Sequence, residues 1–367
     1  NFILQIRPFF IKFKDYIPFM DLHSISSNSQ KSISIWLFSL TIMTFLMIII
    51  GGLTRLTDSG LSMVDWKPIM GTLPPLNHES WLKSFNAYKN SPEFQIVNKG
   101  MDLNSFKYIF LWEWFHRFFA RCIGLVFIVP LIIFIVKKKI SKKFIIGLSF
   151  IFLFGIFQAF VGWWMVKSGL NDNPYVSPYR LTFHLSNAII ILAILFWLSL
   201  NSLLKNNINF LPYNLLESSF IIIISLLFLT IITGAFMAGG NAGQSFNTYP
   251  LMNGLLIPEG YIIEDYGIRN FFENTIAVNF NHRWLATFTF AIIITQTLYL
   301  LFIKKLNQYS IEFILIFIFA NLQFFLGIIT LLTNVKIIYA SMHQVNSILL
   351  LASLMFAYHQ LKRKIEK

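Results

Sequence analysis

The residues of this chain that could do chemistry are one glutamate and four histidines that lie in apolar surroundings. Glu113 precedes His116 by three residues in the stretch LWEWFHRFFAR, so on a helix the two side chains share nearly the same face. The other histidines in apolar runs are His184, His282 and His343. Ionisable groups in hydrocarbon are costly unless they are partnered, which marks all five residues as candidates for a functional site.

Haem is the group that these residues suit best. The chain has a single cysteine, Cys122, and hardly any carboxylates in its apolar runs, so a zinc or di-iron site would lack its usual ligands. A haem iron needs only two axial ligands, on opposite faces of a flat macrocycle, and two facing helices of a bundle supply them. Four histidines therefore predict two bis-histidine haem sites.

An internal repeat pairs these histidines. The matching elements are Phe115-His116-Arg117 with Asn281-His282-Arg283, Gln158 and Gly162 with Gln323 and Gly327, and His184 and Asn187 with His343 and Asn346. The repeats differ at Glu113, whose counterpart is Asn279. An acid beside only one of the two haems suggests a catalytic site next to a cofactor site, because a pair of electron-transfer haems would not need it.

The composition excludes an ordinary soluble domain. Hydrophobic residues make up 56% of the 367 residues and charged residues only 12%, against roughly 25% in soluble domains. The net charge of +13 comes from short basic segments beside apolar runs, which indicates membrane topology and argues against nucleic-acid binding.

The predicted fold is an all-α polytopic membrane protein in which eight transmembrane helices form two pseudo-symmetric four-helix bundles. The apolar runs are 33–52, 110–136, 144–166, 181–200, 217–238, 283–303, 311–333 and 338–360. The expected domains are a cytoplasmic N-terminal segment (1–32), a first bundle for the substrate haem (33–200), a cytoplasmic linker (201–216), a second bundle for a resident haem (217–360) and a cytoplasmic tail (361–367).

Basic segments predict the orientation of the helices. Lysines and arginines gather before residue 32, at 137–143, at 304–305 and at 362–364, which places both termini on the cytoplasmic side. The first apolar run is expected to direct insertion into a bacterial inner membrane, or a mitochondrial one if the protein is organellar. The four histidines then lie near the outer face, beneath the long connections 53–105 and 239–281.

Several residues have two interpretations. Arg117 and Arg283 could neutralise haem propionates or could simply extend to the membrane interface. Glu113 could act in catalysis or could only pair with Arg117 or Arg121. The glutamines and glycines of the repeat fit helix packing better than ligation. Three further histidines are expected at the surface, and they are His23, His78 and His359.

These motifs together resemble the haem A synthase family, in its alphaproteobacterial and mitochondrial branch. The resemblance covers about 33–360. It is carried by GGLTRLTDSGLSMVDWKPIMGTLPP at 51–75, EWFHR at 113–117, FQAFVGWWMVKSGL at 157–170, LTFHLSN at 181–187, NHR at 281–283 and MHQVN at 342–346. The first long loop lacks the cysteine pair of the Gram-positive branch, so no thiol-based step is available there.

The resemblance implies oxidation of the methyl group on porphyrin carbon 8 of haem O to a formyl group, through a hydroxymethyl intermediate. It implies that His282 and His343 bind a resident haem b, that His116 and His184 belong to the substrate site, and that Glu113 is essential. A haem O synthase partner is a family-level expectation, and the sequence does not identify the electron donor.

Two other functions remain open at this point. A di-haem electron-transfer protein of the cytochrome b type would explain four histidines but not the contrast between Glu113 and Asn279. A secondary transporter would suit eight helices with a repeat, but its polar residues would gather at mid-membrane and not at one edge.

Overall fold

The computed structural model describes residues 27–65, 70–171, 173–203, 215–306 and 309–362. Eight of its helices are long and apolar enough to cross a membrane. They are α2 (Ser27–Leu56), α5 (Leu103–Val136), α6 (Lys142–Ser168), α7 (Pro178–Ser202), α8 (Leu215–Gly239), α10 (Thr275–Leu298, continued by the π-helical turn Tyr299–Ile303), α11 (Ser310–Leu332) and α12 (Ile337–Lys362). The all-α class and the eight predicted spans are confirmed.

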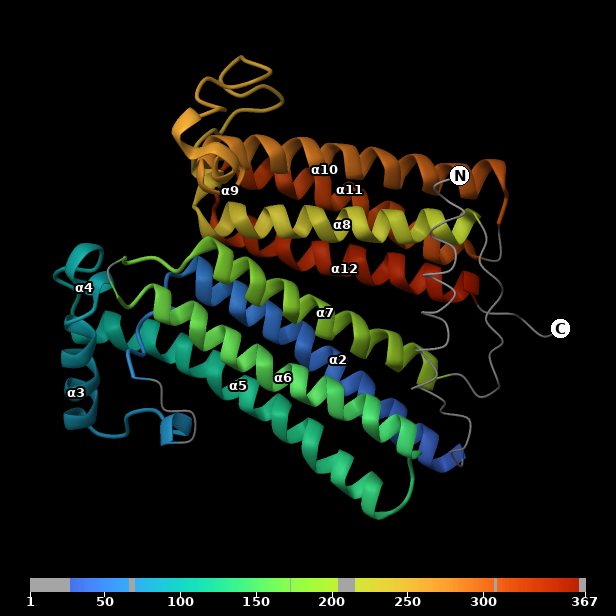
Figure 1. The fold of residues 1–367 in the computed structure, drawn as a ribbon, viewed down its shortest axis with the longest axis horizontal. Helices are drawn as coiled ribbons and strands as arrows, with labels where there is room; N and C mark the ends of the chain where they lie inside the picture. The colour runs from blue at the N-terminus through green and yellow to red at the C-terminus, as the bar shows by residue number, and fades with distance from the viewer. Residues whose placement is uncertain (1–26, 66–69, 172, 204–214, 307–308, 363–367) are drawn as a thin grey trace.

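The eight helices form two groups of four that lie side by side (Figure 1). The first half contains α2, α5, α6 and α7, and the second half contains α8, α10, α11 and α12. The halves meet where α2 and α7 pack on α8 and α12. Ile48, Ile189 and Leu192 of the first half belong to the buried apolar core of the second, so the two halves share part of one core. Their pseudo-symmetry stays a prediction.

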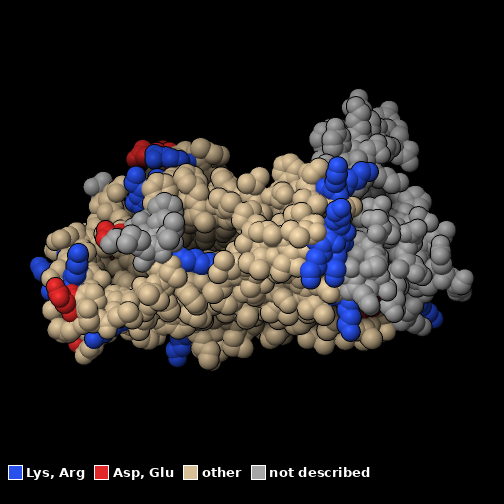
Figure 2. Space-filling view, turned by 90° about the horizontal axis from the view of Figure 1, so that it is seen from below, with Lys and Arg blue, Asp and Glu red and all other residues tan. Residues whose placement is uncertain are grey.

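The two ends of the molecule differ in structure, and we name them by their contents. The loop end carries the connections 57–102 and 240–274, and the terminal end is where α2 begins and α12 ends (Figure 1). Lys and Arg form a band near the terminal end in Figure 2, whereas Asp and Glu occur together with Lys and Arg at the loop end. A broad uncharged belt separates them, as expected for a membrane-spanning surface.

The first connection at the loop end is folded and has its own core. It contains α3 (His78–Lys89), which is capped by Asn77, and α4 (Pro92–Ile96), which is capped by Ser91. Phe85 and Tyr88 of α3 pack against Phe106, at the start of α5. The described part of this connection therefore forms a folded cap at the loop end of the first half.

The second connection is held by asparagines and has few buried apolar side chains. It contains η3 (Ala242–Gln244), η4 (Glu264–Arg269) and α9 (Asn270–Glu273). Asn274 caps α10 and donates to the Gly260 carbonyl at 2.8 Å, while Asn270 donates to the Tyr261 carbonyl at 2.8 Å. Most of the segment between 248 and 273 is exposed.

Some predicted boundaries lie outside the described residues. Residues 1–26 of the N-terminal segment, 204–214 of the linker and 363–367 of the tail are not described, and the division into domains stays a prediction. Helix α10 begins at Thr275, earlier than the predicted apolar run that starts at 283, so His282 lies inside the helix.

The surface placement of His359 was wrong. His359 is 1% exposed, its Nε2 lies 2.8 Å from Oδ1 of Asn201, and its ring packs edge-on against Trp197. The terminal end of α12 packs against α7 there, a contact between distant segments that a single histidine in the sequence does not reveal. His78 is exposed as predicted, and His23 lies outside the described residues.

Candidate functional site

Each of the four predicted histidines packs against a glycine of the neighbouring helix in its own half. A Cβ atom added at these glycines would lie only 2.9–3.1 Å from Cε1 of the imidazole ring. The pairs are Gly51 with His116, Gly162 with His184, Gly234 with His282, and Gly327 with His343. The first two pairs join α2 to α5 and α6 to α7, and the last two join α8 to α10 and α11 to α12. The same contact therefore occurs twice in each half.

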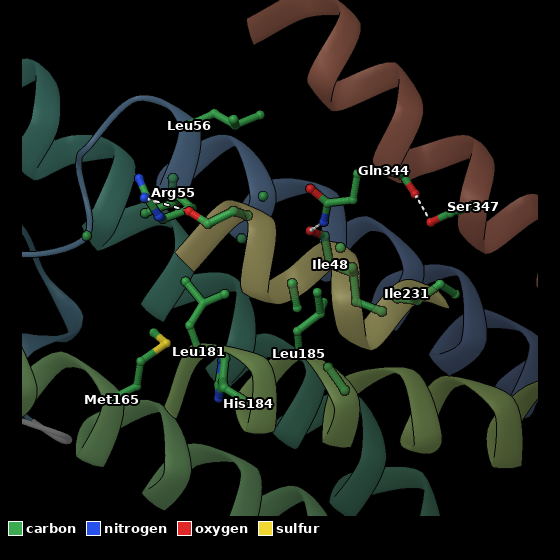
Figure 3. Close-up of a pocket in the computed structure, with 18 of the residues that line it drawn as sticks. Ile48, Arg55, Leu56, Met165, Leu181, His184, Leu185, Ile231, Gln344 and Ser347 are labelled. Carbon is green, nitrogen blue, oxygen red and sulfur yellow. Dashed lines mark hydrogen bonds between the residues drawn. The ribbon is translucent and has the colours of Figure 1, made fainter. Parts of the chain in front are cut away.

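The four histidines line one cavity of about 1160 Å³. This volume exceeds the roughly 300–1,000 Å³ of a typical pocket for one small molecule. Figure 3 shows part of the lining, with Ile48 from α2, His184 from α7, Ile231 from α8 and Gln344 from α12. Both halves thus contribute to the wall of a space large enough for more than one ligand.

The residues present fit haem better than a bare metal ion. Among the described residues, no group of three or more His, Cys, Asp or Glu could hold a metal. The Nδ1 atoms of His116, His184 and His343 are buried and have no hydrogen-bond partner within the part of the chain that the structure describes. Pairs of imidazoles suit an iron that already has four porphyrin ligands.

The glutamines of the repeat support the second histidine of each half. Nε2 of Gln158 donates to the carbonyl of His184 at 2.9 Å and lies 3.4 Å from its Nε2. Gln323 makes the same 3.4 Å contact with His343, and its Oε1 accepts from Asn346. Since 3.4 Å is long for a hydrogen bond, an iron could replace this contact at little cost.

The first histidines of the two halves, His116 and His282, have different surroundings. Oγ1 of Thr233 donates to the Thr230 carbonyl and lies 2.9 Å from Nδ1 of His282. A hydroxyl proton given to that carbonyl leaves Oγ1 to accept from Nδ1 of His282, and Nε2 of the ring is then left for a ligand. The position equivalent to Thr233, directly before Gly51, is Ile50, which cannot hold His116 in this way.

Glu113 is buried and fully hydrogen-bonded. Its Oε2 accepts from Oγ of Ser62 and from the backbone N–H of Met63, each at 2.7 Å, and its Oε1 accepts from Arg117 at 2.5 Å. Arg117 also donates to the Met63 carbonyl at 3.3 Å. The carboxylate therefore fastens the chain that follows α2 over the first-half site, and its predicted pairing with an arginine is with Arg117.

Asn279 occupies the corresponding place in the second half without a charge. It is fully buried, and its Nδ2 donates to the carbonyl of Ala242, in the segment that follows α8. Arg283 donates to the carbonyls of Thr248 and Pro250 at 2.8 and 3.0 Å. Both halves fasten a loop-end segment from this position, but only the first half does so with a carboxylate.

Arg55 and Gln344 connect the halves beside the cavity. Arg55 pairs with Asp58 and reaches the second half, where it donates to the Ala238 carbonyl and to Oδ1 of Asn241, both at 2.8 Å. Gln344 donates to the Ile48 carbonyl at 3.1 Å, and a Cβ at Gly52 would lie 2.0 Å from its Oε1. Figure 3 shows both side chains at the edge of the site.

Sequence reasoning identified the four histidines but missed Gly51, Gly234 and Thr233. Their signal is present, because the segment Ile49-Ile50-Gly51 aligns with Ile232-Thr233-Gly234. It is short and lies in uniformly apolar helices, so only the packing shows that these positions face the histidines.

Comparisons with known proteins identify the family of this chain. Residues 34–355 match a family model described as cytochrome oxidase assembly protein. A heme A synthase of Nitrosospira multiformis is 40% identical over 351 residues, which cover 91% of this chain and 95% of that protein. Heme A synthases of Wolbachia pipientis from Culex pipiens and of Flavobacterium johnsoniae are 41% and 40% identical, with 91% and 92% of this chain and 99% of each relative covered.

Proposed function

Because this chain belongs to the haem A synthase family, its function is the oxidation of haem O to haem A, and we propose that its two halves divide this work. In the proposal, His116 and His184 of the first half bind haem O. His282 and His343 of the second half hold a resident haem b. The observation that supports it most strongly is the glycine–histidine contact, which occurs twice in each half around one cavity.

The contrast between the halves supports this assignment of the two haems. A resident haem needs ligands that stay oriented, and His282 has the Thr233 hydroxyl on its Nδ1. A substrate haem must leave after each turnover, and the Nδ1 of His116 has no partner among the described residues. The acid, Glu113, is also in the first half.

Haem supplies the redox chemistry when it is bound, and the chain supplies ligands, orientation and a pocket from which water is largely excluded. The reaction converts the methyl group on carbon 8 to a hydroxymethyl and then a formyl group. We propose that Glu113 contributes its negative charge beside the methyl-bearing ring, where it would stabilise cationic character as the carbon is oxidised. Ser62, Met63 and Arg117 donate hydrogen bonds to the carboxylate and fix its position.

Arg283 is the better placed of the two proposed propionate ligands. Its Nη1 is buried and has no described hydrogen-bond partner, and its side chain lines the cavity. Arg117 also lines the cavity, but its Nη2 is engaged by Glu113 and the Met63 carbonyl. A propionate at Arg117 would compete with Glu113, whereas one at Arg283 would satisfy a free donor.

We propose that the terminal end faces the cytoplasm, or the matrix in a mitochondrion. The band of Lys and Arg at that end is the support, because basic residues are retained on the cytoplasmic side (Figure 2). Haem O would then be oxidised near the outer face. An electron donor and a haem O synthase are the partners that this function requires.

Haem extraction and mass analysis test the proposal. We expect purified wild-type protein, expressed with haem O supplied, to yield haem b together with haem A or its hydroxymethyl precursor. Glu113→Ala should yield haem b with unchanged haem O. Two equivalents of haem b from both proteins would instead support the electron-transfer alternative and contradict the proposal.

A further inference from the structure

In each half, the second and third membrane helices lie next to each other along a line that we call the seam. The seam lies between α5 and α6 in the first half and between α10 and α11 in the second, and the two seams differ. With the histidines and glutamines of the repeat aligned, Gly124 of α5 corresponds to Phe290 of α10. Ala159 of α6 corresponds to Phe324 of α11. Small residues in the first half thus replace two aromatic rings of the second, on helices that flank the same cavity.

Aromatic rings close the seam of the second half. Phe290 and Phe324 stack with ring centroids 4.4 Å apart and planes 11° from parallel. Tyr249 from the loop end packs edge-on against Phe324, with centroids 6.3 Å apart. Ala320, one turn before Phe324, is 1% exposed. The cavity is therefore shut off from the lipid between α10 and α11.

The corresponding seam of the first half is open. A Cβ added at Gly124 or at Gly155 would have no heavy atom within 4 Å. Gly155, Ile156 and Ala159 of α6 line the cavity and are exposed. Glycine is unfavourable inside a helix, so two of them beside empty space indicate a need for room.

The opening is limited to the outer part of the seam. Towards the terminal end it is closed by Phe127 and Phe152, whose ring centroids lie 5.5 Å apart. In Figure 2, which looks onto the edge of the molecule where α5 lies in Figure 1, the surface is hollowed beside the loop end of the uncharged belt. The opening thus lies on the loop-end side of the Phe127–Phe152 contact and not along the whole helix pair.

We propose that the seam between α5 and α6 is a lateral portal through which haem O reaches the first-half site, with its isoprenoid chain lying between Gly124, Gly155 and Ala159 and extending into the lipid. This inference rests on the proposed function. Haem O differs from haem b in carrying that long apolar chain, which the bilayer accommodates as well as the cavity does. Haem A keeps the chain, so the product can leave by the same route.

The test copies the closed seam of the second half into the first. The double variant is Gly124→Phe/Ala159→Phe, which leaves all four histidines in place; a Cβ at Gly124 meets no heavy atom within 4 Å. Leu125→Phe is the matched control, since Leu125 is 61% exposed and does not line the cavity. Purified proteins that already contain the resident haem are titrated with haem O and separately with haem b, and binding is followed by absorbance.

We expect the double variant to bind haem O at least tenfold more weakly than wild type and the control, with haem b binding changed less than twofold. Unchanged haem O binding would overturn the portal, and an equal loss of both haems would overturn it as well, because the porphyrin pocket itself would be affected. His116→Ala is titrated in parallel. If His116→Ala retains haem O binding while His282→Ala abolishes it, haem O binds in the second half. The proposed function of the halves is then wrong, and the portal in the first half is wrong for that reason.

Discussion

The two halves of this protein are built from the same parts, and they differ at a few positions beside the proposed haem sites. Both place two histidines against glycines of neighbouring helices. In the second half the Thr233 hydroxyl lies beside Nδ1 of His282, and two aromatic rings stack across the seam. The first half has Ile50 in place of that hydroxyl, small residues at its seam and a carboxylate at Glu113. In our proposal, a handful of substitutions within an internal repeat separates a cofactor site from a substrate site.

The largest effect is expected from removing the charge that distinguishes the first half. In Glu113→Gln the amide oxygen can still accept from Ser62 and Met63, while the negative charge is lost. If the charge is what matters, the rate of haem O oxidation should fall on the order of 10²-fold or more, with haem O binding little changed. Single-turnover kinetics with bound haem O measure this.

The comparison variant in the second half is Asn279→Ala, which removes the hydrogen bond from Asn279 to the Ala242 carbonyl. We expect it to weaken retention of the resident haem without an effect of comparable size on oxidation. A Glu113→Gln protein as active as wild type would show that the carboxylate only holds the loop in place. It would contradict the proposal that the charge at Glu113, absent at Asn279, is needed for oxidation.

An intermediate effect is expected at the hydroxyl that orients His282. Thr233→Val keeps the shape of the side chain but removes the partner of Nδ1. Loss of such a partner typically lowers affinity roughly 10–100-fold, so the resident haem should dissociate faster. Transfer of haem to an excess of apomyoglobin measures the dissociation rate.

The reciprocal substitution in the first half tests the same role of the hydroxyl. Ile50→Thr introduces a hydroxyl at the equivalent place in the first half and should slow the release of haem A. If Thr233→Val leaves the dissociation rate of the resident haem unchanged, the orientation of His282 is not what separates the two sites.

A smaller effect is expected in the cap of the first half. Burial raises the pKa of Glu93 from 4.5 to about 7, although the Tyr88 hydroxyl donates to its Oε2 at 2.8 Å. The folded protein then holds this proton over a range in which the unfolded chain has lost it. Stability contributed by the cap should therefore fall as pH rises from about 4.5 to about 7, by at most about 3 kcal/mol, and change little above pH 7.

Thermal unfolding in detergent between pH 5 and pH 8 measures this dependence. Glu93→Gln can still accept from Tyr88 and should flatten the curve in that window. The second connection has no counterpart of this buried acid among its described residues. An unchanged pH profile in the variant would mean that another group controls the cap.

Much of the fold could be predicted from the sequence because its signals are strong and local. The eight apolar runs, each long enough to span the hydrocarbon, appear as eight helices. The glutamines of the repeat were expected to serve helix packing, and the structure shows that each also contacts the second histidine of its half. Glu113 was identified as special from its type and place. Its partners Ser62 and Met63 were not, since they lie some fifty residues earlier in a loop whose path the sequence does not determine.

The missed residues share one physical reason. Gly51 and Thr233 matter only because of the helix that they face, and a helix that is apolar on all sides does not show which side that is. His359 was misplaced for the same reason, because its partners Asn201 and Trp197 belong to another helix.

The division of labour between the halves is best tested by the haem content of His116→Ala beside His282→Ala, each expressed with haem O supplied and analysed by extraction and mass spectrometry. We expect His116→Ala to retain haem b and to lack haem O and haem A, whereas His282→Ala should lose most of its haem b. Loss of haem b from His116→Ala with retention in His282→Ala would contradict the division of labour between the halves.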